Sequence, residues 1–199
     1  DTDGIKTALI SFENIKFSNG IVDGDINAFS NSGVNTSQIS TSGIVGDTIN
    51  TQSFADINEI GTGYISTSDR DDTINSTAII STANIDTYGG DDSINTKLNI
   101  VSSSINTGEG NDSIEALTTI SLSRITTDTG NDSIKALGII SNNKLDTGAG
   151  DDSIISNKSI DDNIINTQAG NDIIDALQDI EGNTIDAGAG DDVIHVSVR

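Results

Sequence analysis

Gly90-Asp91-Asp92-Ser93-Ile94 is the stretch that decides the fold, because it returns at an interval of 20 residues. Related pentapeptides start at positions 110 (GNDSI), 130 (GNDSI), 150 (GDDSI), 170 (GNDII) and 190 (GDDVI). A weaker version, RDDTI, starts at position 70. A fixed period of this length predicts one structural unit per turn of the chain, with each turn stacked on its neighbours.

Three columns of aliphatic residues follow the same period. The steps between them within one period are 6, 5 and 9 residues, which do not fit one face of a helix. β-branched residues between Gly, Asn, Asp and Ser are typical of short strands between turns. We therefore expect an all-β fold, a right-handed parallel β-roll or β-solenoid of about ten coils of ~20 residues. The columns are Ile74, Ile94, Ile114, Ile134, Ile154, Ile174 and Ile194; Ile80, Ile100, Ile120, Ile140, Ile160 and Ile180; and Ile65, Ile85, Ile105, Ile125, Leu145, Ile165 and Ile185.

The chain divides into an irregular part at residues 1–60 and a regular part at residues 61–199. All four Phe residues lie in the first part, whose repeats are weak and out of phase. One interpretation is two or three wider, metal-poor coils that cover the open sheet edge at the end of the solenoid. The alternative is simply degenerate repeats. Because the chain begins at Asp1 and ends at Arg199, just after VIHVSV, we interpret it as a fragment of a longer repeat array.

The composition is strongly acidic, with 31 acidic and 9 basic side chains and a net charge of −22. This charge argues against nucleic acid and anionic membrane surfaces, which need positive patches, and favours bound cations. The sequence contains no run of 18 apolar residues, so no membrane-spanning segment is predicted. The absence of Cys excludes disulfides and zinc thiolate sites, and it suits an exported bacterial protein.

One acidic position recurs in every repeat. At the ~4.8 Å spacing of neighbouring strands, its carboxylates repel one another by roughly 1 kcal/mol per pair even in water. Such a column makes physical sense if a cation lies between the coils. Its members are Asp72, Asp92, Asp112, Asp132, Asp152, Asp172 and Asp192.

Residues 147–155, TGAGDDSII, resemble the haemolysin-type (RTX) nonapeptide GGxGxDxUx. The resemblance implies a parallel β-roll with calcium between successive loops, held by Asp carboxylates and loop carbonyls, and export by a type I system. One nonapeptide per 20-residue period implies one calcium column on one edge, with about five or six Ca²⁺ ions. The implied metal-site residues are the Asp column, with Asp72 in doubt because Ser68 and Arg70 replace glycines, together with Gly90, Gly110, Gly130, Gly150, Gly170 and Gly190.

The chain departs from this family pattern at both leading glycines. Thr or Ala187 replaces the first Gly, and Tyr88, Asp128 and Gln168 replace the second. The Thr column is expected to face inward and to bond neighbouring coils. The residue before the key Asp alternates between Asp and Asn, either as a local turn cap or as a direct calcium ligand. The second corner, such as Ser121 to Arg124, is expected to be a plain turn.

No enzyme is predicted. His195 is the single His and is expected on an exposed strand, and the repeated acidic pairs such as Asp151-Asp152 fit a structural site better than a glycosidase pair. The expected function is a secreted or cell-surface, calcium-binding structural β-solenoid, a segment of a bacterial adhesin or matrix protein. Its expected partners are calcium and either neighbouring solenoid segments end to end or cell-surface components. The alternatives are an ice-binding solenoid and an RTX module of an exported enzyme.

Overall fold

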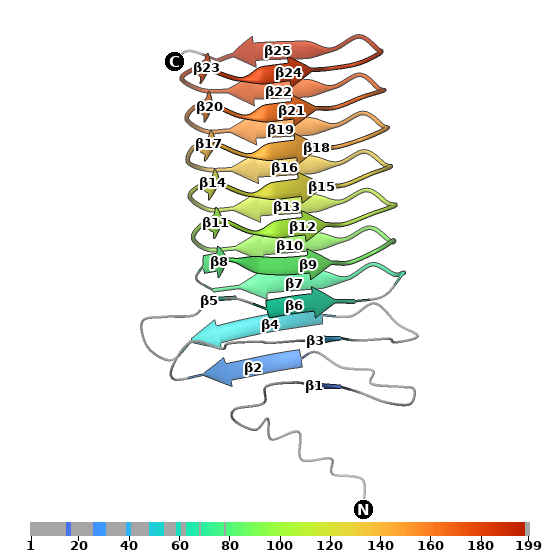
Figure 1. Cartoon of the computed structure of the whole chain (residues 1–199), viewed down its shortest axis with the longest axis vertical. Helices are drawn as coiled ribbons and strands as arrows, with labels where there is room; N and C mark the ends of the chain where they lie inside the picture. The colour runs from blue at the N-terminus through green and yellow to red at the C-terminus, as the bar shows by residue number, and fades with distance from the viewer. Residues whose placement is uncertain are drawn as a thin grey trace, which may run out of the picture.

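A computed structural model describes residues 15–16, 26–30, 39–40, 48–53, 59–60, 63–67, 69–77 and 79–197, and the side chains from residue 65 onward within these ranges. The chain winds as a β-solenoid whose turns stack along one axis (Figure 1). Each regular turn contributes one strand to each of three parallel sheets. In the described residues there is no helix long and apolar enough to cross a membrane.

The strands of each sheet follow one another in order along the stack. The first sheet contains β1 (Ile15–Lys16), β3 (Ile39–Ser40), β6 (Gly63–Ser66), β9 (Ala83–Asp86), β12 (Ser104–Asn106), β15 (Arg124–Thr126), β18 (Lys144–Asp146), β21 (Ile164–Asn166) and β24 (Thr184–Asp186). The second contains β2 (Ile26–Ser30), β4 (Thr48–Ser53), β7 (Thr73–Ser76), β10 (Ser93–Thr96), β13 (Ser113–Ala116), β16 (Ser133–Ala136), β19 (Ser153–Ser156), β22 (Ile173–Ala176) and β25 (Val193–Val196). The third contains β5 (Glu59–Ile60), β8 (Ile79–Ser81), β11 (Ile100–Val101), β14 (Ile120–Ser121), β17 (Ile140–Ser141), β20 (Ile160–Asp161) and β23 (Ile180–Glu181).

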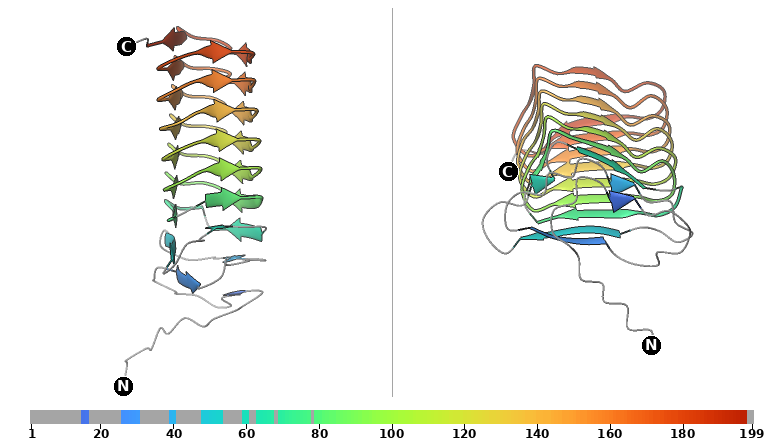
Figure 2. Two further views of the ribbon diagram at one scale, coloured as in Figure 1. Left: turned by 90° about the vertical axis from the view of Figure 1, so that its left-hand side faces the viewer. Right: turned by 60° about the horizontal axis from the view of Figure 1, so that its bottom comes forward.

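The register of the regular part equals the sequence period in all three sheets, so like residues stack on like. Ile94 pairs with Ile114, Ile100 with Ile120 and Ile105 with Ile125. Figure 2 shows the turns lying directly above one another. The parallel β-solenoid is thus confirmed. It has about six turns of about 20 residues, so the expected count of about ten coils is not confirmed.

The first strands pair at wider and less regular intervals than the rest. Ile26 pairs with Ile49, and Ile39 pairs with Ile65, so each of these offsets exceeds one regular repeat and the two differ from each other. Apart from strands β1 to β5, the expected cap at residues 1–60 lies outside the described residues. The regular register begins where β5 pairs with β8.

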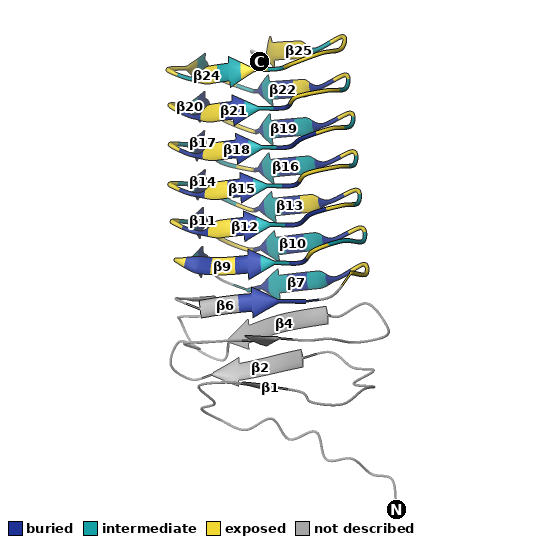
Figure 3. Ribbon diagram, turned by 45° about the vertical axis from the view of Figure 1, so that its right-hand side comes forward, coloured by how far each residue is buried: buried dark blue, intermediate teal, exposed yellow. Residues whose placement is uncertain are grey.

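The core is a stack of aliphatic ladders because each strand turns alternate side chains inward. The three predicted Ile columns are buried from Ile65 to Ile174, with 0–2% of each side chain exposed. Figure 3 shows buried residues alternating with more exposed ones along the strands. In the last turn Ile194 is 51% exposed, because no further turn covers it in the described residues. In the part of the chain whose side chains are described, Ile side chains on successive strands, with Leu145 in one turn, fill the interior without aromatic residues.

The corner between the third and first sheets is more than the plain turn expected. Its second residue has a positive φ in each turn, for example 53° at Leu122 and 57° at Asn142. The residue after it points inward and forms a buried ladder. The Asn143 N–H donates to Asn163 Oδ1 at 2.9 Å, and Asn143 Nδ2 donates to Ile120 O at 3.0 Å. Side-chain amides therefore close this corner at Asn143, Asn163 and Asn183, and Ser hydroxyls do so in the two preceding turns.

Candidate cation site

The loop that carries the repeated Gly and Asp connects the first sheet to the second. Gly110, Gly130, Gly150 and Gly170 have φ between 138° and 151°, a region that favours glycine. A Cβ at Gly130 would lie 1.7 Å from Gly110 O in the turn below. The glycines therefore permit the loop backbones of successive turns to approach closely, which brings the neighbouring Asp side chains into one column.

The repeated Asp residues point into the solenoid. From Asp72 to Asp172 each is only 1–2% exposed, while Asp192 in the last turn is half-buried. From Asp92 to Asp192, each carboxylate accepts a hydrogen bond from the backbone N–H of the Asp one turn earlier. For example, Asp92 N donates to Asp112 Oδ1 at 2.8 Å, and Asp112 N donates to Asp132 Oδ1 at 2.8 Å. We call Asp72, Asp92, Asp112, Asp132, Asp152, Asp172 and Asp192 the buried Asp column.

In five members of this column the second carboxylate oxygen has no hydrogen-bond partner. Oδ2 of Asp92, Asp112, Asp132, Asp152 and Asp172 is buried and accepts no hydrogen bond. The Lys135–Glu115 and His195–Asp175 ion pairs lie outside these five residues. A buried carboxylate without a counter-charge is costly, so the column calls for either bound cations or protons.

Burial dominates the electrostatics of the column. It raises the pKa of Asp92 and Asp132 from 3.8 to about 7 and that of Asp152 to about 6, and it raises the pKa of Asp112 as well. The adjacent Thr hydroxyl and the backbone N–H favour the charged form but do not outweigh burial, and neighbouring carboxylates raise the pKa further.

The Asp or Asn before each buried Asp forms a second, exposed ladder. Asn111 N donates to Asp91 Oδ1 at 2.7 Å, and Asn131 N donates to Asn111 Oδ1 at 2.9 Å. Here the donor lies one turn after the acceptor, the reverse of the buried column. The side chain therefore connects successive turns. This role differs from both interpretations of the sequence, a local turn cap and a direct calcium ligand.

The Thr column lies inside the solenoid, as predicted, next to the buried Asp column. Thr87 Oγ1 donates to Thr107 O at 3.3 Å, and Thr127 Oγ1 donates to Thr147 O at 3.1 Å. The hydroxyls of Thr107 and Thr147 lie near the Asp carboxylates of their own loops, but they are buried and form no hydrogen bond of normal geometry. These hydroxyls add hard oxygen atoms to the interior of the loop.

The chemistry of these donors fits a hard cation such as Ca²⁺, which prefers carboxylate, hydroxyl and carbonyl oxygens. No three carboxylate or imidazole side chains within the described ranges converge closely enough to hold an ion by themselves. Calcium takes ~6–8 oxygens, so loop carbonyls and water have to complete any shell. Several of those carbonyls already bind the next turn; Tyr88 O, for instance, accepts from Glu109 N at 2.9 Å.

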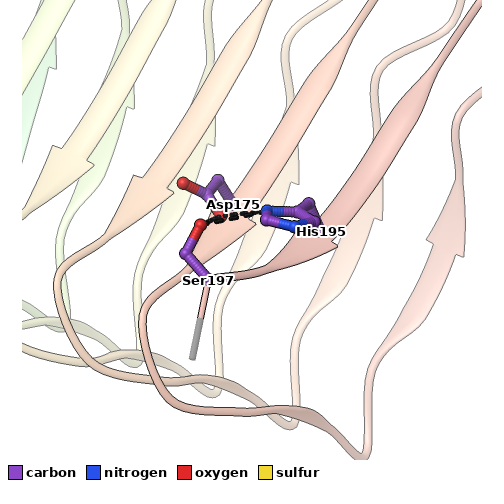
Figure 4. A network of polar contacts seen from close by, with 3 residues as sticks. All are labelled: Asp175, His195 and Ser197. Atoms are coloured by element: carbon purple, nitrogen blue, oxygen red, sulfur yellow. Dashed lines mark hydrogen bonds and ion pairs between the residues drawn. The ribbon is translucent and has the colours of Figure 1, made fainter. Parts of the chain in front are cut away.

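A cluster of Asp175, His195 and Ser197 lies on the outer face of β22 and β25 (Figure 4). His195 is exposed on its strand, as predicted, and its Nδ1 lies 3.3 Å from Asp175 Oδ1 and 3.0 Å from Ser197 Oγ. In a Ser-His-Asp triad the Ser contacts Nε2 while the Asp contacts Nδ1. Here both contact the same nitrogen, so this cluster lacks the geometry that activates a serine.

The structure therefore brings together every Asp that the repeat pattern singled out. The Gly residues at 90 to 190 line the same loop column, and the role of both sets in metal binding stays a prediction. The interior Asn corner was missed, although the run Asn143, Asn163, Asn183 at the regular interval is visible in the sequence.

No protein-family model, curated protein sequence or solved structure matches the chain.

Proposed function

We propose that this chain is a calcium-stabilised structural β-solenoid, a segment of a secreted bacterial surface, adhesin or matrix protein. The observation that carries the proposal is the buried Asp column, with one unpartnered carboxylate oxygen in each of five successive turns. Bound Ca²⁺ would neutralise the column and use those oxygens. The resemblance of residues 147–155 to the RTX nonapeptide supports calcium in particular.

The proposed role of calcium is to couple folding to the compartment. Ions that bind the stacked turns but not the unfolded chain stabilise the fold by mass action. Calcium-poor cytosol then favours the unfolded chain that a type I exporter transports, and calcium-rich surroundings favour the solenoid. The lack of Cys and the net charge of −22 are compatible with this location.

The experiment compares the folding of the chain in EGTA and in calcium at pH 7.5. Circular dichroism should show a β spectrum in millimolar Ca²⁺ and its loss or weakening in EGTA. At a free Ca²⁺ concentration about 100-fold above Kd, a stabilisation of ~2.7 kcal/mol corresponds to a rise in Tm of roughly 5–10 °C. An identical melting curve in EGTA and in calcium would refute the proposal.

Two charge-matched variants locate the ion. Asp152→Asn removes a buried carboxylate, whereas Asp151→Asn removes the exposed carboxylate beside it, and Asn already occupies the exposed position in other turns. Asp152→Asn should raise the Tm in EGTA, because it removes a buried charge, and should reduce the calcium-induced rise. Asp151→Asn should preserve the calcium response. A reversed pattern would place the ions outside the buried column.

The ice-binding alternative gains no support from the outer loop positions. The column that would accompany the exposed Asx ladder reads Gly89, Glu109, Thr129, Ala149, Ala169 and Ala189. A single Thr, with a charged neighbour one turn earlier, does not form a regular flat array of hydroxyls.

A further inference from the structure

The loop edge repeats every two turns, although the sheets repeat every turn. Glu109 N donates to Tyr88 O at 2.9 Å and Ala149 N donates to Asp128 O at 2.9 Å. The corresponding bond from Ala169 N to Gly148 O lengthens to 3.3 Å, and among the described residues none joins Thr129 N to Gly108 O. Successive gaps between turns are therefore not equivalent.

From Thr87 onward the Thr hydroxyls follow the same alternation; Thr67, one turn earlier, also donates to the next turn, to Thr87 O at 3.4 Å, so the alternation begins at Thr87. Thr87, Thr127 and Thr167 donate to the next turn at 3.1–3.3 Å, while Thr107 and Thr147 are the two buried hydroxyls without a partner. We name each gap by its two Asp residues. The Asp92/Asp112, Asp132/Asp152 and Asp172/Asp192 gaps are closed by both bonds. The Asp112/Asp132 gap has neither bond, and the Asp152/Asp172 gap has only the 3.3 Å bond from Ala169 N to Gly148 O; we call these two gaps open.

A sequence alternation explains the two kinds of gap. A Cβ at Gly108 would lie 1.5 Å from Tyr88 O, and a Cβ at Gly148 would lie 1.6 Å from Asp128 O. Only Gly permits this close stacking, so each Gly turn closes onto the turn below. The turns above carry Asp128 and Gln168, whose φ is 60°, and their side chains prevent the same approach.

The open gaps keep more oxygen atoms free. In the Asp112/Asp132 gap, Thr107 Oγ1, Gly108 O, Thr127 O and the two Asp Oδ2 atoms accept or donate no hydrogen bond within the described residues. In the Asp92/Asp112 gap the two Asp Oδ2 atoms are equally without a partner, but Tyr88 O and Thr107 O accept bonds and Thr87 Oγ1 donates one, so the gaps differ in the Thr hydroxyl and the loop carbonyls. Water added to the free set approaches the ~6–8 oxygens that calcium prefers.

We propose that Ca²⁺ binds in alternate gaps, at Asp112/Asp132 and Asp152/Asp172, and not between every pair of turns. This proposal rests on the calcium-binding function proposed above. Because of Asp128, we expect the Asp112/Asp132 gap to bind calcium more tightly than the Asp152/Asp172 gap. Its carboxylate lies near Asp112 and adds negative charge on that side, whereas Gln168 occupies the equivalent position at the other open gap.

The first test is a pair of isosteric variants of the whole chain, titrated with CaCl₂ after removal of calcium with EGTA. Thr107→Val removes a free hydroxyl from an open gap, and Thr87→Val removes a bonded hydroxyl from a closed gap. Thr107→Val should weaken the tightest calcium site about tenfold. Thr87→Val should leave calcium affinity within about twofold and lower the Tm in EGTA. Equal losses of affinity in the two variants would overturn the alternation.

The second test locates the ions directly. Crystals grown with two equivalents of Tb³⁺, a calcium substitute with strong anomalous scattering, should show peaks beside Asp112/Asp132 and Asp152/Asp172. Peaks of equal height in every gap would retain the calcium function and refute the alternation. Failure of the chain to bind either ion would refute both proposals.

Discussion

At the residue scale, one side chain has two tasks in each turn. Oδ1 of Asp132 accepts the N–H of Asp112 and so holds the loop in register, while its Oδ2 is buried without a partner. The first task is structural and neutral amides could perform it, as Asn111 does in the exposed ladder. The hydrogen bond between turns therefore does not require the negative charge of the buried residue.

The close stacking of the loop predicts unequal effects of two Gly substitutions. Gly108→Ala places a Cβ 1.5 Å from Tyr88 O at a φ of 90°, whereas Gly89→Ala meets its nearest atom at 3.5 Å, an ordinary contact. We expect Gly108→Ala to reduce the free energy of unfolding by about 2–4 kcal/mol and Gly89→Ala to change it by under about 0.5 kcal/mol. Urea denaturation in saturating calcium measures both, and similar midpoints for the two variants would contradict the stacking.

At the element scale, the strands are short and depend on their neighbours in the stack. The strands of the regular turns are too short to be stable alone, and their stability comes from pairing with the equivalent strands above and below. The Ile ladders connect successive turns inside the three sheets, and the Asn ladder connects them at one corner. Removal of one rung should therefore act on two interfaces at once.

The Asn ladder offers a direct measure of this coupling. Asn163 accepts from Asn143 N and donates to Ile140 O, both in the turn below. Asn163→Ala leaves buried partners unsatisfied and should reduce the free energy of unfolding by about 1–3 kcal/mol. The exposed Asn157, which lies at a different corner, is the control, and Asn157→Ala should be nearly neutral. Equal calorimetric Tm values for the two variants would show that the ladder carries no stability.

The periodic sequence predicted the inter-turn register well and the loop interior poorly. The regular interval and three Ile columns define which residues stack, because burial of identical side chains needs only the period. The interval does not define which way a loop side chain points, since turn residues such as Leu122, with a φ of 53°, break the strand alternation. The difference between open and closed gaps was also not predicted from the sequence, although Tyr88, Asp128 and Gln168 alternate with Gly at this position.

At the scale of the whole molecule, the fold concentrates negative charge along one axis. The buried Asp column runs through the stack, and the exposed Asx ladder lies beside it. Without cations, the folded state has to hold more protons than the unfolded chain. Stability and pH are therefore linked through the same carboxylates that calcium would bind.

The sign of this linkage gives a prediction for the calcium-free chain. The pKa of Asp92 and Asp132 rises from 3.8 to about 7 on folding, so their protonated forms stabilise the fold fully below pH ~4. This contribution disappears as the pH rises through ~7. In EGTA the Tm should fall by at least about 5 °C between pH 4.5 and 7.5, and calcium should restore it at pH 7.5.

Asp132→Asn should flatten this pH profile, and Asp151→Asn should leave its slope unchanged. A Tm in EGTA that rises with pH over the same range would show that the buried carboxylates are not protonated in the folded chain. Thermal melts by circular dichroism at four or five pH values decide between the two outcomes.

The alternation of Gly with larger residues at the loop edge limits how such a chain can change length. Deletion of the single repeat that contains Gly108 would keep every strand in register but would place Asp128 directly above Tyr88, where Gly108 now makes the close approach. Deletion or duplication of two consecutive repeats preserves both patterns. We therefore expect this array to lengthen or shorten by pairs of repeats. A recombined or engineered solenoid should gain or lose two turns at a time.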